Sequence, residues 1–259
     1  MILIKIGGSI ITDKKKQNSF KKNVMDMLSK EIYKSKEQVV IVHGAGSYGH
    51  IIAKKYKLNQ GFSKDVQKLA FSKTQNMVQK LNSLVLESLN NNKINSVSIP
   101  AHSTIKFYDH KPKVFNYDIF KDFLKNGFTP VTYGDVVIDE KHMFSICSGD
   151  VLMEQLNKYF KPDKCVFIID EDGLFTSNPK KNKDAELIKK TDIKGLENLK
   201  TSFDSHADVT GGMQGKIDTI RNISKKNVDT YLVNGKIPKR LYQVLTDEDT
   251  ICTKISGGK

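Results

Sequence analysis

The sequence predicts an α/β protein, a three-layer α/β/α sandwich built around an open, mainly parallel, twisted sheet. Short apolar runs such as "ILIKI", "VVIVH" and "CVFIID" alternate along the chain with segments of helical period. These runs are apolar at successive positions, which is typical of strands covered on both faces. The alternation of strands and helices favours parallel strands joined by crossover helices. With 259 residues, 38% of them hydrophobic, the chain is long enough for a substantial core.

The predicted elements follow one another in an order that builds a single sheet. Strands are expected at residues 2–6, 39–43, 96–100, 129–133, 165–170 and 230–234. Helical periodicity is found near residues 20–35, 65–91, 117–126, 148–160, 211–226 and 238–245. We interpret 104–116, and the pair 135–139 and 142–146, as hairpins appended to the sheet. One domain is expected over 1–259, with a seam near 160–163 that divides 1–160 from 161–259.

The composition argues against several classes of function. The net charge is +13, but Arg221 and Arg240 are the only arginines, and the lysines are spread along the chain. Specific readers of nucleic acid usually rely on arginine, so we expect a solvated lysine surface that helps to recruit a small anionic substrate. No run approaches the roughly 18 apolar residues of a membrane span, and "MILIKI" is interpreted as a buried strand. The three scattered cysteines are expected to be buried, reduced thiols in a cytoplasmic protein.

The first strand leads into a glycine turn. Lys5 ends the strand, and Gly7, Gly8 and Ser9 follow it. Paired glycines let backbone N–H groups approach a phosphate closely, and a neighbouring lysine adds a charge. The spacing matches neither the P-loop nor the dinucleotide-binding turn, so a tight structural turn is an equal alternative. Lys14 follows within reach of the same strand end, although a "KKK" run usually marks a solvated loop.

A second glycine turn, "HGAGSYGH", follows the second strand. Gly44, Gly46 and Gly49 punctuate a turn that leads into the expected helix "HIIAKKY". Free N–H groups at a helix start can bind an anion, and His50 is expected in the first turn, facing that site. Capping or core packing is the alternative for His50. His43, at the strand end, is interpreted as structural.

Three further turns carry polar residues at predicted strand ends. Asp150 begins a helix, either as a favourable N-terminal charge or as the partner that holds a catalytic lysine in place. Asp170 and Asp172 precede a turn-rich loop, and "TGG" at 210–212 opens a helix that carries Lys216. Glycine-rich strand–helix turns, several lysines and no His/Cys metal set together suit phosphoryl transfer.

These motifs together resemble the amino acid kinase superfamily and, within it, the isopentenyl phosphate kinases. The matching segments appear in the family's order from residue 2 to about 235: "KIGGSIITDK", "VHGAGSYGH", "TPVTYGDVVID", "SGD", "DEDGLFTSNPK" and "DVTGGMQGK". His50 is similar to the histidine with which isopentenyl phosphate kinases bind the phosphate of their acceptor. Ala45 replaces a third glycine, which requires a negative φ there, and Ile169 replaces a threonine near the nucleotide.

The resemblance implies that ATP phosphorylates isopentenyl phosphate to isopentenyl diphosphate, assisted by Mg²⁺ carried on the ATP phosphates. Lys5 and Lys14 would neutralise the γ-phosphoryl group, and Asp150 would orient these lysines. Gly7, Gly8 and Ser9 would contact the ATP phosphates. The rest of the ATP site would comprise Gly46, Asp170, Phe175, Pro179, Lys180, Gly212 and Lys216.

The implied acceptor site has a polar and an apolar part. Ala45, Gly46 and His50 would hold the acceptor phosphate, with Gly149 opposite them. Phe71, Val131 and Ile146 are candidates for lining a pocket for the isoprenoid tail, with core packing as the alternative. By the same resemblance we expect a homodimer, residues 1–160 as the acceptor-binding part and 161–259 as the ATP-binding part, with no nucleic-acid or membrane partner.

Two other functions stay open at this point. The first is another phosphate or phosphonate kinase of the same fold, such as a fosfomycin kinase or a nucleoside monophosphate kinase. The second is a non-catalytic protein that binds nucleotides or nucleic acid, against which the intact Lys5, Lys14, Asp150 and Lys216 argue.

Overall fold

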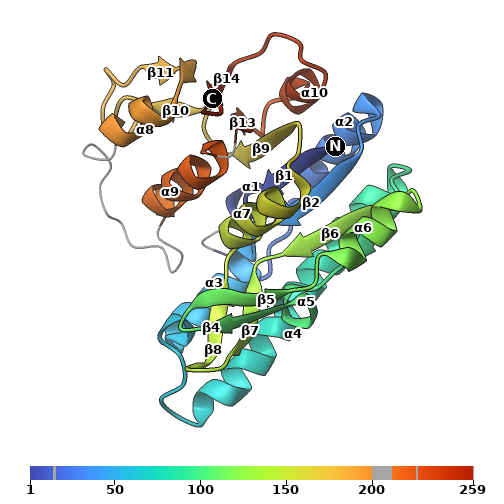
Figure 1. The fold of residues 1–259 in the computed structure, drawn as a ribbon, viewed down its shortest axis with the longest axis vertical. Helices are drawn as coiled ribbons and strands as arrows, with labels where there is room; N and C mark the ends of the chain where they lie inside the picture. The colour runs from blue at the N-terminus through green and yellow to red at the C-terminus, as the bar shows by residue number, and fades with distance from the viewer. Residues whose placement is uncertain (14–15, 200–211, 226, 259) are drawn as a thin grey trace.

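The computed structural model describes residues 1–13, 16–199, 212–225 and 227–258. Its largest sheet has eight strands in the order β12-β14-β13-β9-β1-β2-β6-β3 (Figure 1). These strands are β1 (Ile2–Ile6), β2 (Val39–His43), β3 (Ser96–Ser98), β6 (Thr129–Tyr133), β9 (Lys164–Ile169), β12 (Lys190–Thr191), β13 (Asp229–Asn234) and β14 (Cys252–Ile255). Neighbouring strands pair in parallel except for β13 and β14. The prediction of a mainly parallel sheet is confirmed.

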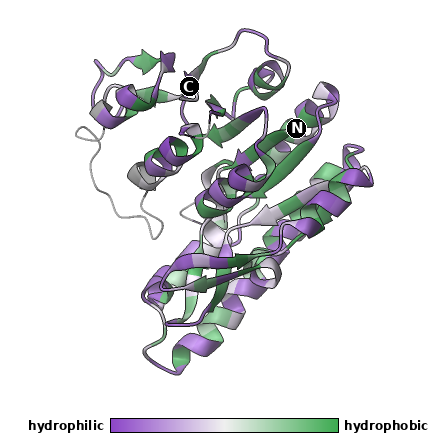
Figure 2. Ribbon diagram, in the orientation of Figure 1, coloured by the Kyte–Doolittle hydropathy of each residue, from purple (hydrophilic) through white to green (hydrophobic). Residues whose placement is uncertain are grey.

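Helices cover both faces of this sheet, which confirms the three-layer architecture. On one face, α2 (Lys22–Ser35), α4 (Val66–Asn91) and α10 (Arg240–Leu245) pack their apolar stripes against Ile2, Ile4 and Ile6 of β1. On the other, α6 (Asp118–Lys125), α7 (Gly149–Phe160), α8 (Ile193–Leu199) and α9 (Gly212–Ser224) pack around Leu3. Figure 2 shows the central strands as the most hydrophobic part of the ribbon. Because side chains alternate along a strand, Lys5 belongs to the same face as Leu3, below α7 and α9.

The two predicted hairpins are present and form a second sheet. Strands β4 (Ile105–Tyr108) and β5 (Lys111–Phe115) pair antiparallel, as do β7 (Asp135–Asp139) and β8 (Met143–Cys147). The order is β5-β4-β7-β8, with a single parallel pair, Phe107 and Asp139, between the hairpins. Figure 1 shows this sheet beside α3 (Gly46–Lys55), α5 (Ala101–Thr104) and α4.

Several short elements were not predicted, or begin elsewhere than predicted. The unpredicted ones are α1 (Gly8–Ile11), α5, α8, the 3₁₀ turn η1 (Leu58–Gln60), β10 (Leu174–Phe175), β11 (Leu187–Ile188), β12 and β14. The helix expected from "HIIAKKY" begins earlier, at Gly46, because Ala45 already has helical dihedral angles. The cysteines are free, but Cys252, expected to be buried, is only partly so because it lies in the short strand β14 near the sheet edge.

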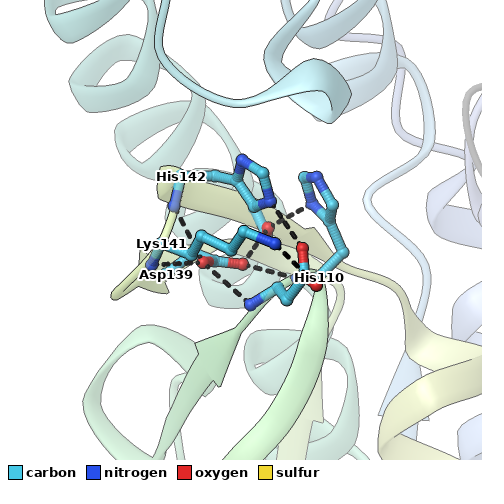
Figure 3. Close-up of polar contacts among 6 residues, drawn as sticks. His110, Asp139, Lys141 and His142 are labelled. Carbon is cyan, nitrogen blue, oxygen red and sulfur yellow. Dashed lines mark hydrogen bonds and ion pairs between the residues drawn. The ribbon is translucent and has the colours of Figure 1, made fainter.

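A buried carboxylate ties the two hairpins together (Figure 3). Asp139 accepts hydrogen bonds of 2.7–3.2 Å from the Ser145 hydroxyl and from the backbone N–H groups of Asp109, His110, Lys141 and His142. Asp109 and His110 form the β4–β5 turn with φ of 51° and 61°, a conformation that costs free energy without glycine. The rings of His110 and His142 stack with centroids 4.0 Å apart. Asp139 therefore stabilises a strained turn and joins it to the next hairpin.

We expect Asp139→Asn to lower the free energy of unfolding by about 2–4 kcal/mol. The NH₂ group of the asparagine would place two N–H donors against backbone N–H groups that need an acceptor. Burial alone would raise the pKa of Asp139, but its hydrogen bonds outweigh burial and hold the pKa below its ordinary value. The stabilisation is therefore fully present above about pH 4 and is lost as the pH falls below it. Urea unfolding at pH 7 and pH 3 measures both effects, with exposed Asp184→Asn as control. Equal midpoints for the two variants at pH 7 would contradict the assignment.

Candidate active site

The two predicted glycine turns lie against each other at the ends of β1 and β2. A Cβ atom on Gly8 would lie 2.7 Å from the Gly46 nitrogen, and one on Gly44 would lie 2.7 Å from the Gly8 nitrogen. Gly46 also has a φ of +51°, a conformation that favours glycine. The backbones of the two turns can therefore touch only because these positions have no side chain. Any groups bound by the turns are consequently brought close together.

Thr12 joins the same two turns by hydrogen bonds. Its side chain is buried, donates to the Gly8 carbonyl over 2.7 Å and accepts from the Ser47 N–H over 3.0 Å. The threonine thus bridges the end of α1 to the first turn of α3. Sequence reasoning missed this residue because a single threonine in "SIITD" carries no periodic or spacing signal.

Lys5 and Asp150 form a buried ion pair next to the glycine turns. The Lys5 Nζ lies 2.6 Å from the Asp150 Oδ1, and both side chains are largely shielded from solvent. Asp150 is in the first turn of α7, whose N-terminus is capped by the Ser148 hydroxyl accepting from the Val151 N–H over 3.2 Å. A Cβ atom on Gly149 would lie 3.1 Å from the Lys5 Cε. The structure therefore brings Lys5, Gly149 and Asp150 together.

Lys216 on α9 adds a second positive charge to this pair. The pKa of Lys5 is lowered to about 8: burial lowers it most, the attraction of Asp150 opposes this, and the charge of Lys216 contributes to the lowering. Burial alone would raise the pKa of Asp150, but the charges of Lys5 and Lys216 outweigh it and hold that pKa below its ordinary value. Two lysines around one carboxylate leave a positive charge in excess. The cluster is suited to binding an anion.

The residues predicted for the acceptor phosphate are collected at the start of α3. Ala45 has a φ of −64°, which meets the condition for alanine at this position. Gly46 opens the helix, so His50 lies in its second turn and not, as predicted, in its first. The helix begins early because Ala45, with φ of −64° and ψ of −20°, already has helical dihedral angles shortly after β2 ends. His50 is partly buried there.

The residues predicted for the nucleotide lie around the end of β9. The exposed Lys180 contacts Glu171 over 2.5 Å and lies 3.9 Å from an Asp170 oxygen. Phe175 is in β10, and Pro179 lies just beyond it, both partly buried. Arg240, not predicted for the site, donates to Asp172, which also accepts from Asn234 over 2.9 Å. Gly212 opens α9, whereas Lys14 and the "TG" of 210–211 lie outside the described residues.

The predicted tail-binding residues separate into two groups. Phe71 and Ile146 pack against one apolar cluster, which contains Phe144 and Ala53 of α3. The rings of Phe71 and Phe144 lie 5.5 Å apart. Val131 belongs to a different cluster beneath α2 and α4 and is fully buried. The structure therefore places Phe71 and Ile146 beside the helix of His50 and leaves Val131 in the core.

Comparison with known proteins identifies the family of this chain. The family model described as "Amino acid kinase family" matches residues 1–234. This chain belongs to the amino acid kinase family.

Individual members of the family are similar over the whole chain. The isopentenyl phosphate kinase of Methanothermobacter thermautotrophicus is 33% identical, over 99% of this chain and 99% of its own. A solved isopentenyl phosphate kinase structure superposes with a TM-score of 0.87 at 30% identity, covering 99% and 100% of the two chains. A structure described as an isopentenyl phosphate kinase substrate complex gives 0.84 at 28% identity, covering 98% and 100%. The resemblance inferred from the motifs is confirmed.

The described residues of this amino acid kinase contain neither a membrane-spanning helix nor a cluster of metal ligands. None of their helices is long and apolar enough to cross a membrane. Nor does that part of the chain contain a group of three His, Cys, Asp or Glu side chains able to hold a metal ion.

The buried cluster predicts an unusual lysine. We expect the Lys5 ammonium to titrate near pH 8, and Asp150→Asn to lower its pKa further, because the variant removes the charge that opposes burial. NMR of ¹³C,¹⁵N-labelled lysine as a function of pH measures both values. Asp65→Asn, at an exposed carboxylate that contacts Lys68, is the control and leaves Lys5 unchanged. Titration of Lys5 near 10.5, as in an unburied lysine, would contradict the assignment.

Proposed function

We propose that this chain transfers the γ-phosphoryl group of ATP to isopentenyl phosphate, giving isopentenyl diphosphate and ADP. The observation that carries the proposal is the contact between two glycine turns beside Lys5 and Lys216, in a chain that is similar over its full length to isopentenyl phosphate kinases. Each turn can hold one phosphate. The donor and the acceptor are then adjacent, as an in-line transfer requires.

One of the two glycine turns would bind ATP and the other would bind the acceptor. Gly7, Gly8 and Ser9, with Lys5 at the end of their strand, would hold the ATP phosphates. Gly212 and Lys216 at the start of α9 would complete this grip, since Lys216 is close enough to act on the pKa of Lys5. The remainder of ATP would lie along the loop of Asp170, Phe175, Pro179 and Lys180, beside the end of β9.

The acceptor phosphate would lie at the start of α3, opposite Gly149. Ala45, Gly46 and His50 would bind it, with Gly46 close enough to Gly8 to contact both phosphates. The phosphate oxygen of the acceptor is already an anionic nucleophile at neutral pH, so the site has no need of a strong general base. The main barrier to the reaction is the repulsion between the acceptor phosphate and the ATP phosphates, which lysine charges and N–H groups reduce.

The buried aspartate would act on the lysine and not on the substrates. Asp150 fixes the Nζ of Lys5 with a 2.6 Å hydrogen bond, so the ammonium needs no reorganisation when phosphate arrives. Lys14, outside the described residues, would supply a further positive charge to the γ-phosphoryl group. Mg²⁺ would enter on the ATP phosphates and shield their charge. Asp150 and Asp172 are each already paired with a basic side chain, so neither is offered as its ligand.

The rest of the proposal rests on the resemblance. The isoprenoid tail would contact Phe71 and Ile146 beside α3. Residues 1–160 would bind the acceptor and, through the turn at 7–9, the ATP phosphates, while 161–259 would bind the rest of ATP. Strands from both parts share one sheet. We also propose a homodimer that acts in the cytoplasm, without a nucleic-acid or membrane partner.

A panel of acceptors tests the activity. We expect turnover of isopentenyl phosphate and of dimethylallyl phosphate, with kcat/KM for fosfomycin and for UMP at least about 100-fold lower. A coupled ADP assay with purified protein measures all four. Absence of turnover of both prenyl phosphates would overturn the proposal. Efficient use of fosfomycin or UMP would favour the corresponding kinase, and a salt-sensitive shift of labelled DNA would favour nucleic-acid binding.

A histidine variant tests the acceptor site. We expect His50→Ala to raise KM for isopentenyl phosphate about 10- to 100-fold, because a hydrogen bond to a charged group is lost. KM for ATP should stay within about twofold. His50→Gln keeps a donor at a similar reach and should recover part of the loss. A rise in KM for ATP of similar size would show that His50 does not belong to the acceptor site.

A further inference from the structure

His43 is a buried histidine placed directly before the acceptor turn. It ends β2, is fully buried, and stacks on Tyr133 with ring centroids 5.2 Å apart. Its Nδ1 lies 3.1 Å from the carbonyl oxygen of Gly44, and its Nε2 lies 3.2 Å from the side-chain amide oxygen Oδ1 of Asn82 on α4. Burial lowers the pKa of His43 to about 4, so the ring is neutral at pH 7. One of its two nitrogens therefore carries the only ring N–H proton.

The hydrogen-bond partners of the ring determine which nitrogen of His43 carries the proton. The Gly44 carbonyl can only accept, whereas the amide of Asn82 can present oxygen or nitrogen after a half-turn. With the proton on Nδ1, the ring donates to Gly44, and Nε2 accepts from the amide nitrogen. The amide is placed with its oxygen toward Nε2 and its nitrogen donating to the Ser98 hydroxyl over 2.8 Å. The half-turn exchanges these two atoms, so that the amide oxygen accepts from that hydroxyl. The other tautomer sets a ring lone pair against a carbonyl lone pair at 3.1 Å in a buried place.

This hydrogen bond has a consequence for the turn that follows. The described chain contains no cis peptide bond, so the Gly44 carbonyl and the Ala45 N–H point in opposite directions. Because the Gly44 carbonyl points toward the His43 ring, the Ala45 N–H points away from that ring. The preceding peptide group, between His43 and Gly44, is also fixed, since its N–H donates to the Ile6 carbonyl and its carbonyl accepts from the Gly134 N–H, each over 3.0 Å.

We propose that His43 is a positioning residue: its Nδ1–H holds the Gly44 carbonyl and thereby aims the Ala45 N–H at the acceptor phosphate. The inference rests on the proposed function, because it assigns a task within the acceptor site. It changes the interpretation of His43 from a residue that only packs to one that sets the geometry of substrate binding. Asn82 and Ser98 complete the chain of hydrogen bonds that holds the ring in one orientation.

Two isosteric variants separate positioning from packing. In His43→Asn the amide nitrogen, bonded to Cγ, can replace Nδ1, whereas in His43→Gln the amide nitrogen lies one bond further, at the position of Nε2. Both variants lose the stacked ring and should melt at similar temperatures. We expect His43→Gln to raise KM for isopentenyl phosphate about 5- to 10-fold, with KM for ATP within about twofold. His43→Asn should stay within about twofold of the parent for both substrates.

Equal KM for isopentenyl phosphate in the two variants, or a parallel rise in KM for ATP, would overturn the proposal. NMR of the ¹⁵N-labelled parent gives a test that does not depend on folding of the variants: we expect a protonated Nδ1 and an unprotonated Nε2 on His43. A protonated Nε2 would overturn the proposal as well. A parent protein with the expected tautomer but no turnover of prenyl phosphates would instead overturn the proposed function and leave the hydrogen bond established.

Discussion

The direct contact between the two glycine turns is the constraint on which the site depends. Strands β1 and β2 pair in parallel with Lys5 opposite Val42 and Ile6 opposite His43, so both strands end at the same level of the sheet. Parallel strands release their chains at one edge, where ligands of α/β proteins gather. Because Gly8, Gly44 and Gly46 have no side chains, the two emerging backbones meet without displacement. A methyl group at any of these positions would push apart the two phosphates that the proposed reaction has to bring together.

The charge distribution follows from the alternation of β1. Ile4 and Ile6 pack beneath α2 and α4, which leaves Lys5 on the face of α7 and α9. A buried lysine is costly unless a partner compensates it, and Asp150 at the N-terminus of α7 does so while benefiting from the helix dipole. Lys216 adds a second positive charge, which the single carboxylate of Asp150 does not neutralise. The cluster stays one negative charge short, and in the proposed reaction a phosphate would supply that charge.

Much of this arrangement could be predicted from the sequence, because it depends on local pattern. The apolar runs, the Gly7–Gly8 pair and the predicted hairpins each lie where their residues indicated, and Asp150 has the lysine partner that was one of its two predicted roles. The misses depend on contacts between distant segments. Thr12, the Arg240–Asp172 pair and the burial of Val131 in another cluster are set by how helices dock on the sheet. Strands of two residues, such as β10 and β12, are too short to show a period.

Helix α4 connects the two ends of the proposed acceptor site. Asn82 contacts His43 behind the phosphate turn, and Phe71 borders the apolar cluster beside α3. Between them, Val78 packs closely on Gly49, since a Cβ atom on Gly49 would lie 3.0 Å from the Val78 Cγ2. At about 1.5 Å per residue, Phe71 and Asn82 are roughly 16 Å apart along the helix axis. A regular helix keeps that spacing fixed, as a loop cannot. In the proposed reaction, α4 would therefore help to set both the orientation of the phosphate turn and the length of tail that fits beside it.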